Sequence, residues 1–235
     1  MSFIDSEMKK TVIIVAGGTG TRVNAHMPKQ FMPIGGIPML AYSIKTFHKY
    51  DPEMEIIVAL NPDYLDQWHE LAKEIHIQNI PVKIVNGGKE RFYSVSNALN
   101  SISHATGLVA IHDAARPFVS GLLIDSLFNH AEKAGSAIPA MPLKDSIRAH
   151  VMDEWVVADR AHIRTIQTPQ VFDLEKLKLA YQQPYQPKFT DDATVYESVG
   201  NKVYLIEGEE NNFKITTEKD MEYAEWLVGN RGRIS

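Results

Sequence analysis

The stretch Thr11-Val-Ile-Ile-Val-Ala-Gly-Gly-Thr-Gly-Thr-Arg22 decides the fold class of this chain. Its first six residues are apolar or β-branched, so they predict a strand that is buried on both faces, as in a parallel sheet. The glycines that follow allow backbone N–H groups to approach a bound phosphate at the start of a helix. The stretch therefore predicts the first strand of an α/β sheet, followed by a phosphate-binding loop.

Outward from this stretch, the chain alternates between strand and helix patterns. This alternation predicts an α/β protein with a doubly wound, mostly parallel sheet, in which ligands bind at the carboxyl ends of the strands. The further predicted strands are residues 55–60, 82–85, 108–112 and 136–141, each apolar enough to be buried on both faces. The predicted helices are residues 39–48, 63–76, 91–101 and 120–134.

The alternation ends after residue 141. Residues 146–151 and 155–158 flank the turn-like Met152-Asp-Glu, which predicts a β-hairpin. We expect a single domain over residues 1–235, with this hairpin forming a protruding arm at about 142–165 that joins two copies in a homodimer. An arm that folds back on its own domain fits the pattern almost as well. The chain should then return through residues 174–181 and 193–198, a strand at 203–207 and a closing helix at about 218–228.

The composition excludes several classes of protein. A hydrophobic share of 44%, a charged share of 23% and a net charge of −5 fit a globular protein with no nucleic-acid partner, because binding phosphate backbones needs surplus Lys and Arg. Without cysteine there is no disulfide, thiolate nucleophile or cysteine metal site. The first ten residues are largely polar and charged and contain no apolar h-region, and no later stretch approaches the roughly 20 apolar residues of a membrane span. We therefore expect a cytoplasmic protein with no membrane partner.

The glycine loop by itself is weak evidence for nucleotide binding. It lacks the Lys-Ser/Thr ending of a P-loop and the full spacing of a dinucleotide fingerprint, and a purely structural turn is an alternative. Arg22, and Lys29 in Pro28-Lys29-Gln30-Phe31, strengthen the nucleotide interpretation. They place two cations just beyond the loop, where the charge of a triphosphate would lie.

Further segments, spread in order over nearly the whole chain, resemble one family. They are Gly87-Gly88-Lys89-Glu90-Arg91 with Ser94-Val95, His112-Asp113-Ala114-Ala115-Arg116-Pro117, Asp159-Arg160, Gln167-Thr168-Pro169-Gln170, Thr190-Asp191-Asp192-Ala193 and Asn212-Phe213-Lys214-Ile215-Thr216-Thr217. With the glycine loop, these segments are similar to those of the 2-C-methyl-D-erythritol 4-phosphate cytidylyltransferases of the non-mevalonate isoprenoid pathway. The resemblance implies a Rossmann-like nucleotidyltransferase fold. It also implies an enzyme that uses Mg²⁺ to join CTP to a small polyol phosphate and release pyrophosphate.

The resemblance assigns roles to individual residues. Since the attacking phosphate is already an anion, no strong base is needed, and cations that neutralise the transition state should dominate catalysis. The implied catalytic residues are Arg22, Lys29 and Lys214. The implied CTP-binding residues are Ala16, Gly17, Gly18, Gly20, Arg22, Lys29, Gly87, Gly88, Arg91, Ser94 and Asp113. The implied acceptor-binding residues are Arg116, Ser146, Arg160, Thr168, Thr190 and Lys214, with Arg160 and Thr168 supplied by the partner subunit's arm region.

Asp113 is the predicted metal ligand. It follows the strand at 108–112 directly, so its carboxylate should lie at the ligand-binding edge and could hold Mg²⁺ or orient a sugar hydroxyl. A helix N-cap, or an ion-pair partner of Arg116, is the structural alternative. We favour the functional role.

Two departures from the family concern the acceptor. Asp145-Ser146 replaces the commoner Asp-Thr, which keeps the hydroxyl and loses a methyl group. The sequence Val15-Ala16-Gly17-Gly18 is shared with ribitol-5-phosphate cytidylyltransferases, so ribitol 5-phosphate is the alternative acceptor. A non-catalytic nucleotide-binding module is a further alternative, which the joint presence of the predicted cations and Asp113 disfavours. A nucleotide-dependent oxidoreductase is disfavoured because the acidic ribose partner of its fingerprint is missing.

Overall fold

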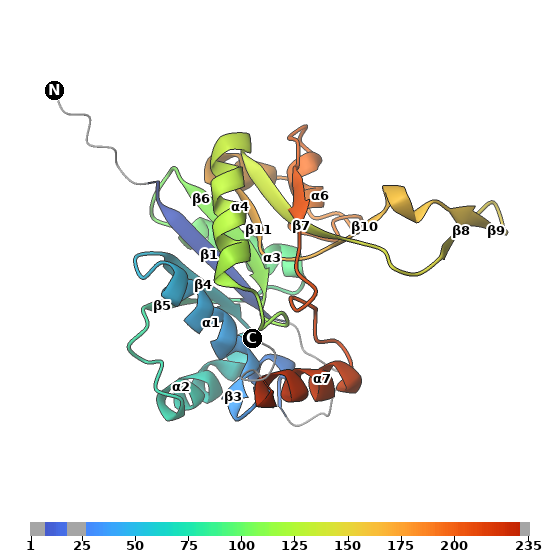
Figure 1. Cartoon of the computed structure of the whole chain (residues 1–235). Coiled ribbons are helices and arrows are strands. Elements are labelled where there is room, and N and C mark those ends of the chain that lie inside the picture. The colour runs from blue at the N-terminus through green and yellow to red at the C-terminus, as the bar shows by residue number, and fades with distance from the viewer. Residues whose placement is uncertain (1–7, 18–26, 231–235) are drawn as a thin grey trace.

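An eight-stranded sheet forms the centre of the computed structural model, which describes residues 8–17 and 27–230 (Figure 1). Four strands make its parallel core in the order β5-β4-β1-β6. They are β1 (Lys10–Ala16), β4 (Glu55–Leu60), β5 (Val82–Asn86) and β6 (Leu108–Asp113). The chain moves from β1 outward to β5 and then returns to the other side of β1. This reversal of strand order creates the crevice in which such sheets bind ligands, and it confirms the predicted doubly wound α/β fold.

Helices cover both faces of the sheet. One face carries α1 (Met39–Tyr50), α2 (Leu65–Glu74) and α4 (Gly121–Ala134), and the other carries α3 (Arg91–Ser101), α5 (Leu174–Ala180) and α6 (Asp192–Glu197). Side chains of β1 alternate between the two resulting cores, Val12 and Ile14 on the first and Ile13 on the second. Because both faces are covered, the strand is apolar throughout, as its sequence predicted.

The second half of the sheet is mixed. β7 (Ser136–Pro142) runs in the same direction as β6, but β11 (Gln170–Asp173) lies antiparallel between them. β10 (Arg164–Ile166) pairs antiparallel with the end of β7, and β12 (Leu205–Glu207) pairs parallel with it. The sequence predicted β7 and β12 but not β10 or β11. Runs of three or four residues are too short to show a periodic pattern. They become strands because they pair with strands that are distant in the sequence.

Two predicted elements differ in detail. β5 was expected to be buried on both faces, but it lies at the sheet edge and none of its residues is fully buried. The helix expected at 63–76 begins as a 3₁₀ turn, Pro62–Tyr64, and α2 ends at Glu74. Asn61 caps the 3₁₀ turn by accepting a hydrogen bond from the backbone N–H of Asp63 at 3.1 Å. The prediction missed this earlier start.

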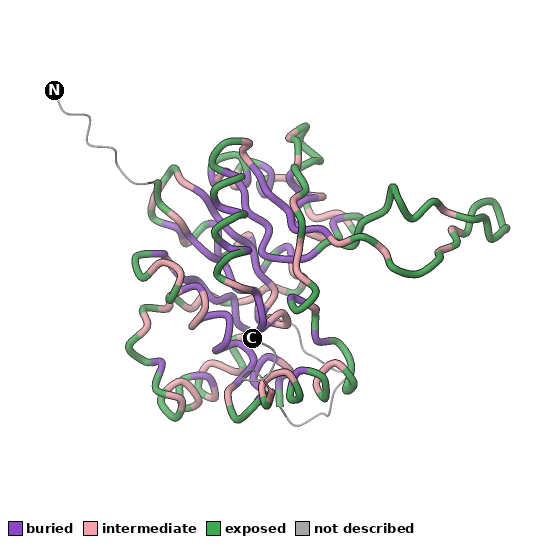
Figure 2. Tube along the Cα trace, in the orientation of Figure 1, coloured by how far each residue is buried: buried purple, intermediate pink, exposed green. Residues whose placement is uncertain are grey.

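The predicted β-hairpin is present between β7 and β10. β8 (Ile147–Val151) and β9 (Glu154–Ala158) pair only with each other and project from the body of the molecule (Figure 1). Met152 and Asp153 form the turn with φ of 47° and 65°, the left-handed conformation that a two-residue hairpin of this twist requires. The arm is exposed along nearly its whole length (Figure 2).

A third, smaller core lies beneath the last helix. α7 (Glu218–Gly229) packs on the short hairpin of β2 (Pro33–Ile34) and β3 (Ile37–Pro38), and Ile34, Ile215 and Ala224 are buried between them. This packing brings the segment before α1 next to the segment after β12. No helix within residues 8–17 and 27–230 combines the length and apolarity needed to cross a membrane.

Candidate functional site

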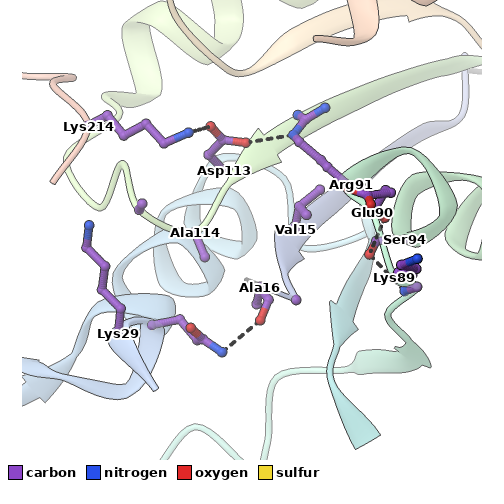
Figure 3. Close-up of a pocket in the computed structure, with 14 residues that line it drawn as sticks. Val15, Ala16, Lys29, Lys89, Glu90, Arg91, Ser94, Asp113, Ala114 and Lys214 are labelled. Carbon is purple, nitrogen blue, oxygen red and sulfur yellow. Dashed lines mark hydrogen bonds and ion pairs between the residues drawn. The ribbon is translucent and has the colours of Figure 1, made fainter. Parts of the chain in front are cut away.

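A cavity of about 380 Å³ lies at the carboxyl ends of β1 and β6 (Figure 3). Val15 pairs with Asp113 across β1 and β6, and Ala16 pairs with Leu60 across β1 and β4, so the ends of three parallel strands meet there. This is the edge at which the sequence predicted a ligand. The described residues that line the cavity are Val15, Ala16, Gly17, Lys29, Gln30, Gly88, Lys89, Glu90, Arg91, Ser94, Asp113, Ala114, Ala115 and Lys214.

Asp113 is held between two cations that approach it from opposite sides (Figure 3). Its Oδ2 accepts a hydrogen bond from Lys214 Nζ at 2.7 Å, and its Oδ1 accepts one from Arg91 Nε at 3.2 Å. Burial alone would raise the pKa of Asp113, but Arg91 and then Lys214 hold that pKa well below its usual value. Asp113 is therefore a carboxylate at neutral pH, with each of its oxygens facing a cation.

The glycine turn after β5 forms one wall of the cavity. Gly88 N–H donates to Ser94 Oγ at 2.9 Å, which fixes the turn to the first turn of α3. A Cβ on Gly88 would lie 2.3 Å from the Cβ of Tyr93, so no other residue fits without movement of the backbone. A Cβ on Gly17 would lie 3.2 Å from Ser94 Oγ. The two glycines thus let main chain and hydroxyl approach closely, as expected for a surface that faces a ligand. Gly87 is not part of the lining, and a Cβ on it would lie 3.4 Å from Ser94 Oγ.

Lys29 is brought to the cavity by its neighbour Gln30. Gln30 is buried, and its Nε2 donates to the carbonyl of Ala16 at 2.8 Å. This hydrogen bond ties the 3₁₀ turn Lys29–Phe31 to the end of β1. Figure 3 shows Lys29 on the same side of the cavity as Lys214. Three other predicted residues, Gly18, Gly20 and Arg22, lie outside the described residues.

The predicted acceptor residues fall into two groups. Thr168 and Arg116 lie next to the cavity: Thr168 Oγ1 accepts a hydrogen bond from the backbone N–H of Asp113 at 3.0 Å, and Arg116 donates to the carbonyl of Asn212 at 2.7 Å. Burial lowers the pKa of Arg116. Lys214, which was also predicted to bind the acceptor, lines the cavity itself. The other three lie further out: Thr190 just before α6, and Ser146 and Arg160 on the exposed arm. Within one chain, most of the described residues that were predicted to bind CTP line the cavity, whereas of the predicted acceptor residues only Lys214 does.

Several residues of the site were not assigned a role from the sequence. They are Val15, Gln30, Lys89, Glu90, Ala114 and Ala115 in the cavity wall, and Asp192 and Asn212 behind it. Most stand within motifs already quoted, so closeness to the assigned residues was the available signal. Asp192 also stands in a quoted motif, but that motif does not reveal its partner, because Arg91 is 101 positions away in the chain.

His112 links the two halves of the site. Its Nε2 lies 3.1 Å from the carbonyl of Arg116, and its Nδ1 lies 3.3 Å from Thr168 Oγ1. Because a carbonyl only accepts hydrogen bonds, Nε2 carries the proton and Nδ1 accepts from the Thr168 hydroxyl. Complete burial lowers the pKa of His112 to about 4, so the ring is neutral at pH 7.

Lowering the pH from 7 to 5 is expected to reduce the free energy of unfolding by about 2 kcal/mol through His112 alone. The unfolded chain binds a proton on this ring below pH about 6.5, whereas the folded chain does so only near pH 4. Between these values, protons favour the unfolded state, so stability falls as the pH falls. Urea unfolding at both pH values should show a smaller pH effect in His112→Gln than in the wild type. Equal pH effects in the two proteins would contradict this account.

Comparison with known proteins identifies the family. The family described as "IspD: 2-C-methyl-D-erythritol 4-phosphate cytidylyltransferase" matches residues 10–230. A protein of that name from Bacteroides fragilis is 42% identical over 221 residues, which cover 94% of this chain and 100% of the relative. Another from Caldanaerobacter subterraneus subsp. tengcongensis is 38% identical over 225 residues, covering 94% of this chain and 99% of the relative.

Solved structures agree. A 2-C-methyl-D-erythritol 4-phosphate cytidylyltransferase from Thermus thermophilus superposes with a TM-score of 0.76 at 30% identity, covering 94% of this chain and 100% of the other. A 4-diphosphocytidyl-2C-methyl-D-erythritol synthase from Anaerococcus prevotii reaches 0.81 at 26% identity, covering 94% and 99%. The chain therefore belongs to the IspD family of 2-C-methyl-D-erythritol 4-phosphate cytidylyltransferases, enzymes of the non-mevalonate pathway, as its motifs predicted.

Proposed function

We propose that the cavity binds CTP and 2-C-methyl-D-erythritol 4-phosphate together and transfers the cytidylyl group to the acceptor. An oxygen of the acceptor phosphate forms a bond to the α-phosphorus of CTP, the bond between that phosphorus and the bridging oxygen breaks, and pyrophosphate leaves with the electron pair. The observation that carries this proposal is the gathering of Lys29, Lys214 and the Arg91–Asp113 pair around one cavity at the strand-order reversal.

The chemistry follows from the charges. Two phosphate-bearing anions must approach each other, so the main task of the site is to neutralise them and hold them in line. Lys29 and Lys214 supply positive charge from the 3₁₀ turn and from the segment before α7. The tight glycine turns leave room for the base and ribose on the other wall. The predicted roles of Gly17, Gly88 and Ser94 in CTP binding are consistent with this arrangement.

Mg²⁺ fits this site as an ion carried mainly by the triphosphate. No cluster of three or more His, Asp or Glu side chains suited to a metal occurs in the described part of the chain, and the carboxylates that line the cavity are Asp113 and Glu90. Magnesium in nucleotide enzymes commonly takes one or two carboxylates and otherwise phosphates and water. Asp113 is the residue that would hold it. When bound, the ion would shield the charge of the phosphates. Lys214 contacts the same carboxylate in this structure, so the lysine and the ion would compete for Asp113.

Purified protein with CTP, Mg²⁺ and 2-C-methyl-D-erythritol 4-phosphate is expected to release pyrophosphate at a rate that EDTA abolishes. D-Ribitol 5-phosphate, tested in parallel, should support little release, since the family match favours the methylated tetritol. The measurement is a coupled assay of pyrophosphate. A preference for ribitol 5-phosphate would overturn the acceptor while keeping the chemistry. If neither acceptor supports pyrophosphate release, the alternative of a non-catalytic nucleotide-binding module is favoured.

We also infer that the arm packs on a second copy of the chain. A lone two-stranded hairpin is marginally stable in water, yet this one exposes large apolar side chains. Trp155 is 66% exposed and Val157 is 75% exposed, and both point to the same face of β9. Arg160, a predicted acceptor residue, lies two positions after the end of β9. A dimer that buries this face would bring Arg160 to the partner's site and complete the acceptor set.

Mixing two inactive variants tests this dimer. Arg160→Ala and Lys29→Ala chains should each be nearly inactive alone. Co-refolded in equal amounts, they should recover about a quarter of the wild-type activity, because half of the dimers are mixed and each mixed dimer holds one intact site. Activity is measured as pyrophosphate release before and after mixing. If mixing restores nothing while size-exclusion chromatography shows mixed dimers, the acceptor site is built within one chain.

A further inference from the structure

A chain of alternating charges extends from the cavity into the protein interior. Lys214 and Arg91 flank Asp113, and Arg91 continues to Asp192, which is completely buried. The Arg91 guanidinium donates from both terminal nitrogens to the two oxygens of Asp192, at 2.9 and 2.7 Å. Only Nε remains directed at Asp113, at 3.2 Å. The stronger, two-pronged contact of Arg91 is therefore the one outside the cavity.

Asp192 is itself fixed in place. It is the first residue of α6, and Tyr181 donates its hydroxyl to Asp192 Oδ1 at 2.7 Å. Gln170, on β11, accepts from the backbone N–H of Ala193 at 2.9 Å and donates to Asp191 Oδ2 at 2.9 Å. The first turn of α6 is thus tied to the central sheet. These contacts make Asp192 a rigid anchor for the guanidinium.

The position of Asp192 determines which nitrogens of Arg91 bind each of the two carboxylates. A planar guanidinium prefers a two-pronged contact with one carboxylate. While both terminal nitrogens of Arg91 bind Asp192, only its Nε–H can donate a hydrogen bond to Asp113. Asp113 Oδ2 is then left to Lys214 and the cavity. Without the charge of Asp192, Arg91 would turn toward Asp113 and cover both of its oxygens.

We propose that Asp192 is a positioning residue for the transfer reaction. It acts through Arg91, so that Oδ2 of Asp113 faces Lys214 and the cavity instead of the guanidinium. The proposal rests on the proposed function, because it assumes that Asp113 and Lys214 work in the active cavity. Asp192 contacts no residue of the cavity wall other than Arg91 in the described hydrogen bonds and ion pairs. Its effect on turnover must therefore pass through the guanidinium.

A double-mutant cycle between Asp192 and Asp113 tests this route. Asp192→Asn keeps the shape of the side chain and removes the charge, and it should lower kcat by about 10- to 100-fold, the usual effect of a residue that orients a working group. Asp113→Asn should lower kcat at least as much. If Asp192 acts through Asp113, the double variant should lose less than about threefold beyond Asp113→Asn alone. A loss in the double variant equal to the product of the two single losses would overturn the proposal, as would an Asp192→Asn enzyme within threefold of the wild type.

Two further variants separate positioning from folding. Asp191→Asn removes a charge from the same turn of α6 but retains a good N-cap, and its kcat should stay within about threefold of the wild type. Asp192→Asn could fail to fold because Arg91 loses its charged partner. In that case the combined change Asp192→Asn with Arg91→Gln removes the buried charge of Asp192 together with the charge that pairs with it. This pair should show the same non-additivity with Asp113→Asn, and additivity in the folded pair overturns the proposal. Wild-type turnover is measured first: an inactive wild type would refute the proposed function, whereas an active wild type with additive variants refutes only the role of Asp192.

Discussion

Replacing Lys214 with alanine is expected to lower kcat by about 10²- to 10³-fold, the cost of removing one preorganised electrostatic contact from a transition state. Lys214 lines the cavity, and its ammonium is 2.7 Å from Asp113 Oδ2. Charge builds up on the bridging oxygen as pyrophosphate leaves, so a cation here contributes most in the transition state. KM for CTP should change much less than kcat. Steady-state kinetics with both substrates varied provide the measurement.

Lys214→Arg and Lys73→Ala serve as controls. Arginine keeps the charge but not the shape, so Lys214→Arg should recover part of the loss. Lys73 forms an exposed ion pair with Glu70 at 2.8 Å on α2, far from the cavity lining. Lys73→Ala makes the same change of charge and should retain wild-type kcat. A Lys214→Ala enzyme within about threefold of the wild type would exclude the proposed role.

Lys29→Ala is expected to cause a loss of kcat of the same size, about 10²- to 10³-fold. Lys29 lies on the cavity wall in a turn that Gln30 ties to the end of β1, so its charge is held where the triphosphate would bind. Truncating the side chain leaves Gln30 and the buried Phe31 in place, and the fold should survive. Arg22→Ala carries the same expectation from the sequence.

Calorimetry distinguishes a role of Lys29 in the transition state from one in binding. CTP titrated into Lys29→Ala without acceptor should bind with an affinity within about tenfold of the wild type, while turnover falls much further. A thermal unfolding curve checks that the variant is folded. If affinity and kcat/KM fall by the same factor and kcat is unchanged, Lys29 contributes uniform binding energy, and its catalytic role is wrong.

The fold was largely predictable because its signals are local. The five β-rich runs and the helical spacing between them define buried strands and covering helices without reference to any partner. Residues 91–101 were predicted as a helix and match α3 residue for residue. The hairpin turn at Met152 and Asp153 was equally local. β10 and β11 escaped prediction because strands of three or four residues owe their conformation to the strands beside them.

The site was predictable only in part, for a related reason. Asp113 was expected at the ligand edge because it directly follows a buried strand, and it lies there. The assignments of Lys29 and Lys214 came from motifs, and both residues line the cavity. Their catalytic roles, like those of Arg116, Ser146, Arg160, Thr168 and Thr190 in acceptor binding, stay predictions. Gln30 lay within a quoted motif, but its hydrogen bond to Ala16 depends on how the chain returns to β1.

The amino-acid sequence was sufficient to predict the doubly wound sheet, the sheet edge at which the cavity lies and the family, because strand patterns, glycine turns and ordered motifs consist of consecutive residues. The connection from Lys214 through Asp113 and Arg91 to Asp192 was decided by the tertiary structure. Its members come from β6, α3, α6 and the segment before α7. Ion pairs between residues about a hundred positions apart depend on how helices pack across a sheet, and no local pattern encodes that packing.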